Sequence, residues 1–221
     1  MNSMPHPVIL VEGLDGVGKS TLVHTIATKL HASIIASPPK MPDPFDEHCD
    51  LRIRMDQSEP SIRREFYRSG NFYASLLIEE ARKDGPVILD RYWPSTASFA
   101  VLDAHQPLWE PIGVWPQGLV KPDIMILLTV NEENRIKRMA SRGLAMTEEE
   151  ICLEEKKKSR GNVLNALRCF EPIEIDTSHL NSEEVFNEVM HWLNQAGVLN
   201  YDELNNHEST VISDSTNGVR I

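Results

Sequence analysis

Apolar residues follow two alternating patterns along the chain. Short runs in which nearly every residue is apolar, such as 8–11 and 124–130, are typical of strands buried on both faces. Between these runs, apolar residues recur three or four positions apart, as Leu22, Ile26 and Leu30 do, which is the spacing of an amphipathic helix. The patterns predict strands at 8–11, 33–37, 87–89, 124–130 and 172–176, and helices at 20–31, 61–83, 96–102, 132–141, 147–168 and 182–196.

This alternation of strands and helices predicts the fold class. Parallel strands need a crossover of a dozen or more residues, and strands that are apolar throughout need cover on both faces. The sequence therefore predicts an α/β fold of three layers, a parallel sheet with helices on both faces. Residues 1–198 are expected to form one domain, with irregular chain at 103–122 and at 38–58, where one helix is expected. The polar residues 199–221 are expected to be a disordered tail.

Composition narrows the choice of partners. A net charge of −11, from 22 basic and 33 acidic residues, argues against nucleic acid and against an anionic membrane surface. No apolar stretch approaches the roughly 18 residues of a membrane span. Cys49, Cys152 and Cys169 lack CxxC spacing, which favours a reducing compartment and no zinc site. The start MNSMPHPVIL carries no leader, so the chain is expected to be cytoplasmic.

The segment GLDGVGKS, residues 13–20, matches the phosphate-binding pattern G-x-x-x-x-G-K-[ST] between a predicted strand and a predicted helix. Its glycines allow positive φ angles that turn backbone N–H groups inward. Lys19 is expected to reach the terminal phosphates, and Ser20 to ligate Mg²⁺. Asp15 is either a further acid at the phosphates or a solvated loop acid. The nucleotide-binding residues predicted here are Gly13, Leu14, Asp15, Gly16, Val17, Gly18, Lys19, Ser20 and Thr21.

The segment DRYWPST, residues 90–96, places an acid and a base directly after the predicted strand 87–89. Ligands of doubly wound sheets bind at the carboxyl ends of the strands, so Asp90 is expected beside the phosphate loop, where it would reach the metal. Arg91 would hold a second phosphate through its planar guanidinium. The alternative interpretation is that Asp90 caps the next helix and Arg91 pairs with a neighbour.

The phosphate loop, the DRY segment with a serine five residues after its Asp, and the basic segment RIKRMASRG together resemble the thymidylate kinase family of nucleoside monophosphate kinases over residues 8–196. EPSIRREFYRSGN (59–71), DRYWPSTASFA (90–100) and WPQGLVKPDIMILLTV (115–130) are similar to its mitochondrial UMP–CMP kinase branch. The resemblance implies a P-loop fold with a five-stranded parallel sheet and a lid at about 142–158. It implies transfer of the ATP γ-phosphoryl group, with Mg²⁺, to CMP, UMP, dCMP or dUMP. It also makes mitochondria the alternative location and leaves a homodimer open.

The resemblance also gives roles to individual residues. Phe66 or Tyr67 would stack on the pyrimidine, and Phe99 would line the sugar. Arg138 and Arg142 would start the lid, over the adenine or the transferring group. The catalytic residues implied are Lys19, Asp15, Asp90, Arg91 and Arg142, and the substrate-binding residues are Arg63, Phe66, Tyr67, Asn71, Arg91, Ser95 and Phe99.

Two positions depart from the family pattern. Thymidylate kinases place an arginine on the long helix where this sequence has Asn71. Arginine only donates hydrogen bonds, whereas an amide donates or accepts, so asparagine suits both uracil and cytosine and favours a UMP/CMP-type acceptor. The phosphate-binding arginine that the family has after Pro38-Pro39 is absent. The residues that would replace it are Lys40, Arg52, Arg63 or Arg64.

Two rival functions stay open beside this one. A strict dTMP kinase would have the same phosphate loop and DRY segment. A nucleotide-sensing protein would keep the phosphate loop without turnover. A GTPase is disfavoured because the sequence has no N-K-x-D motif for guanine.

Overall fold

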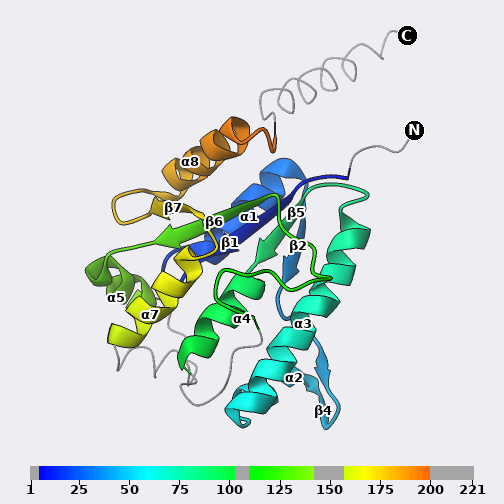
Figure 1. Ribbon diagram of the computed structural model, residues 1–221. Coiled ribbons are helices and arrows are strands. Elements are labelled where there is room, and N and C mark those ends of the chain that lie inside the picture. Colours follow the sequence, from blue (N-terminus) through cyan, green and yellow to red (C-terminus); the bar gives the residue numbers. More distant parts are fainter. Residues whose placement is uncertain (1–4, 103–109, 142–156, 200–221) are drawn as a thin grey trace, which may run out of the picture.

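A computed structural model of the chain describes residues 5–102, 110–141 and 157–199. Five strands form one parallel sheet in the order β2-β5-β1-β6-β7, with β1 in the middle (Figure 1). The strands are β1 (Val8–Glu12), β2 (Ser33–Ala36), β5 (Val87–Asp90), β6 (Ile124–Thr129) and β7 (Ile173–Asp176). This sheet confirms the predicted fold class. Arg142, most of the predicted lid and the tail from residue 200 lie outside the described residues.

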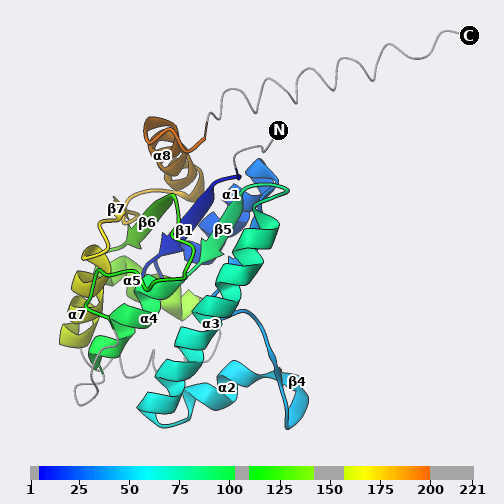
Figure 2. The ribbon, with the colours of Figure 1, turned by 45° about the vertical axis from the view of Figure 1, so that its right-hand side comes forward.

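Helices cover both faces of the sheet, as the sequence predicts. The helices α1 (Lys19–Leu30) and α8 (Ser182–Gln195) contact each other on one face. The other face carries α3 (Pro60–Ala81), α4 (Trp93–Phe99) with the short helix η1 (Ala100–Leu102), and α7 (Lys157–Arg168) (Figures 1 and 2). The helix α5 (Glu132–Ser141) follows β6 at the carboxyl edge of the sheet. Within the described ranges, no helix combines the length and apolar character that crossing a bilayer requires.

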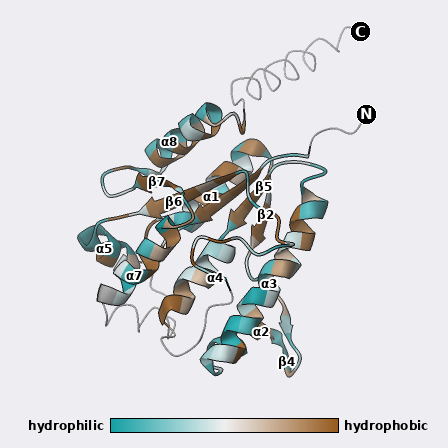
Figure 3. Ribbon diagram, in the orientation of Figure 1, coloured by the Kyte–Doolittle hydropathy of each residue, from teal (hydrophilic) through white to brown (hydrophobic). Residues whose placement is uncertain are grey.

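The core lies in and around the strands. Residues 8–11 of β1 and 126–128 of β6 have no exposed surface, and the strands are apolar on both faces. Figure 3 shows this distribution, with apolar strands inside and polar residues on the outer surfaces of the helices. The continuous apolar runs in the sequence are therefore explained by burial on both sides of the sheet.

A hairpin between β2 and α3 differs from the sequence prediction. We expected irregular chain with one helix at 38–58, and the structure adds β3 (Pro42–Asp43) and β4 (Asp46–Asp50) before α2 (Leu51–Asp56). The carboxylate of Asp43 accepts hydrogen bonds from the Phe45 N–H (2.9 Å) and from the Arg54 side chain (2.7 Å). The hairpin thus depends on a local turn and one side-chain contact, which leave no periodic pattern in the sequence.

The helix α4 begins at Trp93, three residues before the predicted start. Pro94 stands in its first turn, where a missing N–H group costs nothing. The Trp93 indole N–H donates to the Val114 carbonyl oxygen (2.9 Å), which fixes the loop before β6 against this helix. The tryptophan therefore serves packing.

We expect Gly13→Ala to destabilise the protein more than Gly18→Ala does. Both residues have positive φ, +146° and +102°, so both substitutions introduce backbone strain. A Cβ at Gly13 would also lie 2.6 Å from the Leu128 carbonyl oxygen, whereas nothing lies within 4 Å of one at Gly18. Forcing atoms into a packed region costs about 1–3 kcal/mol. Urea unfolding of the two variants should differ by about this amount, and equal unfolding free energies would refute the packing argument.

Candidate active site

The loops after β1 and β5 leave the sheet side by side. The two strands are parallel neighbours, and Val11 is in register with Asp90. The phosphate loop at 13–18 and the DRY segment therefore start from the same carboxyl edge, as the sequence predicts. The charge of Asp90 acts on both Lys19 and Arg91. The structure thus brings the two predicted segments together in one cleft.

The phosphate loop has the conformation its glycines allow. Gly13, Gly16 and Gly18 all have positive φ, and Gly18 is the N-cap of α1 in the left-handed region. Lys19 is buried and folds back over the loop, with Nζ donating to the Leu14 carbonyl oxygen (2.9 Å). Burial, and next the nearby Arg91, lower the pKa of Lys19 to about 8. The loop therefore presents backbone N–H groups and one strongly perturbed lysine to an anion.

Arg91 points toward the phosphate loop. Its Nη2 lies 2.8 Å from Oδ1 of Asp15, and its Nη1 donates to the Ser95 hydroxyl oxygen (3.1 Å). The guanidinium also lies 5.7 Å from the centre of the Phe99 ring. Oδ1 of Asp15 is in turn 3.6 Å from Nζ of Lys19. Asp15 therefore bridges two cations from different loops, at a point where a phosphate could interact with both.

The positive charge of Arg91 is stabilised by several carboxylates. Burial alone would lower the pKa of its guanidinium, but Asp15, Glu12 and Asp90 outweigh this effect and raise it. The backbone of Arg91 has a φ of +65°, which is rare for a residue other than glycine. A strained residue with a compensated charge is typical of a functional site.

Glu12 is a part of this site that the sequence analysis missed. It ends β1, has no exposed surface, and its carboxylate accepts hydrogen bonds from Tyr92 and Ser95. Burial raises the pKa of Glu12, against the opposing effects of Arg91 and of these hydrogen bonds. An acid directly after an apolar strand was the signal that identified Asp90, and it applies equally to Glu12.

Asn71 lies on the inner face of α3 and is fully buried. Its Nδ2 donates to the Tyr67 carbonyl oxygen (2.9 Å) and to the Thr96 hydroxyl (2.8 Å), and its Oδ1 accepts from the Ser37 hydroxyl (2.7 Å). Both N–H groups of the amide are thus used inside the protein. Ser37 and Thr96, whose hydroxyls contact this buried amide, are themselves partly exposed.

Of the other basic and aromatic residues of α3, some contact α2 and one lies on the inner face of α3. The Tyr67 hydroxyl donates to the Asp56 carboxylate (2.7 Å), and an Arg63 nitrogen lies 3.5 Å from the Asp56 carbonyl oxygen. The Phe66 and Tyr67 rings meet edge to face, with centroids 5.6 Å apart. Arg64 is buried on the inner face with Asn71, two turns away. Arg64 is therefore buried with Asn71, whereas Arg63 contacts α2.

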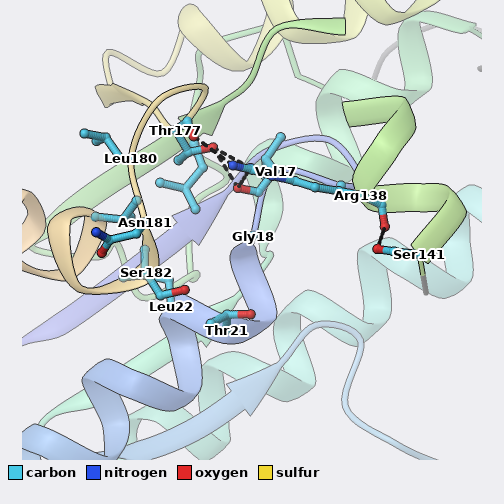
Figure 4. A pocket seen from close by; sticks show the side chains of 13 residues that line it. Val17, Gly18, Thr21, Leu22, Arg138, Ser141, Thr177, Leu180, Asn181 and Ser182 are labelled. Atoms are coloured by element: carbon cyan, nitrogen blue, oxygen red, sulfur yellow. Dashed lines mark hydrogen bonds between the residues drawn. The ribbon is translucent and has the colours of Figure 1, made fainter. Parts of the chain in front are cut away.

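A cavity of about 380 Å³ opens behind the phosphate loop (Figure 4). The start of α1 and the loop 177–182 before α8 form two of its sides, and α5 contributes Arg138 and Ser141. Arg138 donates to the Thr177 hydroxyl and to the Thr177 carbonyl oxygen, both at 2.8 Å. The sequence predicted Arg138 but missed the loop 177–182, because a loop after the last strand carries no nucleotide motif.

Two buried arginines beside the phosphate loop share one carboxylate of α5, and one of them, Arg160, joins α7 to α5. Arg135 and Arg160 both contact the Glu132 carboxylate, with the shortest distances 3.0 and 2.7 Å. A Cβ at Gly16 would lie 3.0 Å from Cγ of Arg135, so this cluster packs directly against the phosphate loop. The cluster supports the phosphate loop at Gly16, and sequence reasoning did not identify it.

The donor groups present fit Mg²⁺ held jointly with a nucleotide. Within the described ranges, no group of three or more His, Cys, Asp or Glu side chains could hold a metal alone. Mg²⁺ is usually bound by one or two carboxylates together with substrate phosphates and waters. Ser20, at the start of α1, and Asp90, at the end of β5, are the two predicted protein ligands, and they stand at the same edge of the sheet.

Comparison with known proteins places the chain among nucleotide kinases. A family model described as thymidylate kinase matches residues 11–189. UMP-CMP kinase 2, mitochondrial, of Homo sapiens is 37% identical over 163 residues, which are 71% of this chain and 35% of that protein. The chain thus spans about a third of that relative's length. A probable thymidylate kinase of Methanocaldococcus jannaschii is 26% identical, covering 84% of this chain and 94% of that protein.

Solved structures share the fold at lower identity. Thymidylate kinase from Candida albicans superposes with a TM-score of 0.66 at 19% identity, covering 89% of this chain and 95% of that one. Deoxyadenosine kinase from M. mycoides superposes with a TM-score of 0.53 at 16% identity, covering 85% and 99%. The fold, the two converging loops and the match of one family model over most of the sequence lead to one conclusion: the chain belongs to the thymidylate kinase family.

Proposed function

We propose that the chain transfers the γ-phosphoryl group of ATP to a pyrimidine nucleoside monophosphate. The observation that carries this proposal is the position of Asp15 between Lys19 and Arg91, 3.6 and 2.8 Å from their nitrogens. Two cations from two loops that converge on one anionic group suit a phosphate shared by a donor and an acceptor. The family match and the human UMP-CMP kinase relative support the same reaction class.

The residues of the two loops position different phosphates. The phosphate loop and Lys19 bind the β- and γ-phosphates of ATP, and Arg91 holds the acceptor phosphate in line with them. Ser20 and Asp90 would hold Mg²⁺, which neutralises charge on the transferring group. The cavity beside Arg138 and Thr177 would take the adenine. Arg142 is proposed to act on the transferring group, by resemblance to the family.

The hydrogen bonds around Asn71 support a pyrimidine acceptor of either type. Because Asn71 donates to the Thr96 hydroxyl, Thr96 keeps its own proton for another acceptor. Because the Ser37 hydroxyl donates its proton to Asn71, Ser37 keeps its lone pairs. One donor and one acceptor side by side suit the 4-oxo group of uracil and the 4-amino group of cytosine. We therefore propose that Asn71 acts on the base through these two hydroxyls.

The strict dTMP kinase and the nucleotide sensor are the rival proposals. The thymidylate kinases among the relatives support the first, and ATP binding without turnover would support the second. The human relative is named as mitochondrial, which supports that location over the cytoplasm. The homodimer stays a prediction.

A panel of acceptors tests the proposal directly. We expect ADP release from ATP·Mg with CMP, UMP, dCMP or dUMP, measured by a coupled assay on the whole chain. Turnover with dTMP alone would contradict the Asn71 argument and support a strict dTMP kinase. ATP binding without ADP release on any of the five acceptors would support a sensor and refute the kinase.

Arg91→Ala should impair the acceptor side of the reaction selectively. Removing a charged donor aimed at a reacting group typically costs about 10²–10³-fold in rate. We expect kcat/KM for the acceptor to fall by about this factor while ATP affinity changes by less than about threefold. Arg168→Ala, which removes an exposed arginine paired with Glu174, is the matched control and should leave both values unchanged. Equal losses in acceptor and ATP binding would contradict an acceptor-side role.

ATP affinity should fall as the pH rises above about 8. The pKa of Lys19 is about 8 without nucleotide, so the side chain is mostly neutral above that pH, whereas bound phosphates favour its charged form. Binding then takes up a proton, and affinity should weaken by up to about tenfold per pH unit. Calorimetry from about pH 7 to 9.5, in buffers of different ionisation enthalpy, measures both effects. Lys19→Arg stays charged throughout and should show a flat profile, and a flat wild-type profile would refute the argument.

A further inference from the structure

The carboxylate of Glu12 lies buried beneath the turn that carries Arg91. Because Val11 is in register with Asp90, Glu12 at the end of β1 stands next to the residue after Asp90. Oε1 accepts the N–H groups of Tyr92 (2.9 Å) and Ser95 (3.2 Å), and Oε2 accepts the Ser95 hydroxyl (2.6 Å). All three donors thus lie within residues 92–95, directly after Arg91.

Burying a carboxylate costs free energy, so the groups that it contacts indicate what it stabilises. Residues 8–11 before it are apolar and fully buried, and an apolar residue at position 12 would extend that strand without desolvating a charge. The adjoining turn is strained, because Arg91 has a φ of +65°. The Arg91 N–H donates to the Val11 carbonyl oxygen (3.2 Å), and the next N–H, of Tyr92, donates to Glu12. The end of β1 therefore holds the strained residue on both sides.

The Ser95 hydroxyl connects Glu12 to the guanidinium. Arginine can only donate hydrogen bonds, so the Ser95 oxygen must accept from Nη1 of Arg91 at 3.1 Å. The single proton of the hydroxyl is then available to Oε2 of Glu12, which accepts it as a carboxylate. A protonated Glu12 would donate to the same oxygen and leave the serine proton with no acceptor there. The donors and acceptors therefore fit one chain of hydrogen bonds, in which Arg91 donates to Ser95 and Ser95 donates to Glu12.

We infer that Glu12 is a positioning residue that aims the Arg91 guanidinium at the acceptor phosphate, by holding the Arg91 turn and by orienting the Ser95 hydroxyl. The inference rests on the proposed function. The contact of Arg91 with Asp15 is on the open side of the cleft, where both side chains are about a quarter exposed, and an entering phosphate would replace it. The contact with Ser95 is on the buried side and would persist, so Glu12 keeps the guanidinium in place while its other partner is exchanged.

Glu12→Gln tests the role because it keeps the size and removes one acceptor. Whichever way the amide is turned, its N–H groups face either the two backbone N–H donors or the Ser95 oxygen that accepts from Arg91. We expect the Kd of CMP and UMP, measured by calorimetry without turnover, to rise by about tenfold or more, with ATP affinity within about twofold of wild type. Ser95→Ala, which leaves two hydrogen bonds on Glu12, should show the same selective loss and is informative even where Glu12→Gln does not fold.

Ser98→Ala is the matched control. Ser98 is a fully buried serine on the same helix, and its hydroxyl has no hydrogen-bond partner within the described part of the chain. Its variant should bind CMP and UMP as the wild type does. A loss equal to that of Ser95→Ala would overturn the inference, because it would show general sensitivity of α4 to serine substitution.

A double-mutant cycle with Arg91→Ala separates positioning from general stability. If Glu12 acts through Arg91, Glu12→Gln should change the Kd by less than about twofold once Arg91 is absent. A full loss in that background, or an equal loss of ATP affinity, would overturn the inference. Failure of the proposed function can be told apart from failure of this inference. A chain that binds CMP but releases no ADP is not a kinase, yet the double-mutant cycle can still be measured on it. A wild-type chain that binds no monophosphate would overturn both proposals.

Discussion

The carboxylate of Asp15 lies between two cations from different loops, 2.8 Å from Arg91 and 3.6 Å from Lys19, and the rest of the site is organised around this contact. Two cations this close repel each other, and Arg91, after burial, contributes to the lowered pKa of Lys19. The charges of Asp90 and Glu12 act to raise the pKa of both Lys19 and Arg91. The nucleotide-free cleft is therefore electrostatically compensated, and a phosphate that replaces Asp15 meets two cations already held in place.

This arrangement depends on the register of the parallel strands. Pairing of Val11 with Asp90 makes the two loops start from the same edge, and the strain of the site is concentrated in the first residues beyond that edge. A Cβ at Gly13 would lie 2.6 Å from the Leu128 carbonyl oxygen, so a larger residue there requires a shift of the backbone, and Arg91 has a left-handed backbone. The central strands, which have no exposed surface in residues 8–11, supply the rigid support that such strained loops need.

Sequence analysis predicted those features that depend on neighbouring residues. The strands, the helices, the phosphate loop and the DRY segment each have a local signature, and the alternation of elements then implies a common edge. The loop 177–182 and the cluster around Glu132 become part of the site through contacts between distant segments, so no local pattern marks them. Glu12 does carry a local signal, an acid directly after an apolar strand, but its partners Tyr92 and Ser95 belong to a distant segment. Tyr67 and Arg63 could be assigned to α3, but their contacts with Asp56 follow from the packing of α2, which periodicity does not fix.

We propose that Asn71 and Glu12 act in the same way. Each is fully buried and fixes the direction of hydroxyl groups, Asn71 those of Ser37 and Thr96, and Glu12 that of Ser95. The direction of a hydroxyl proton changes what a site donates or accepts while leaving the backbone unchanged. Two proteins of the same fold can therefore differ in the acceptor they select without differing in shape. We therefore propose that selectivity in this site depends on buried side chains that do not touch the ligand, because these determine which proton each contacting hydroxyl presents.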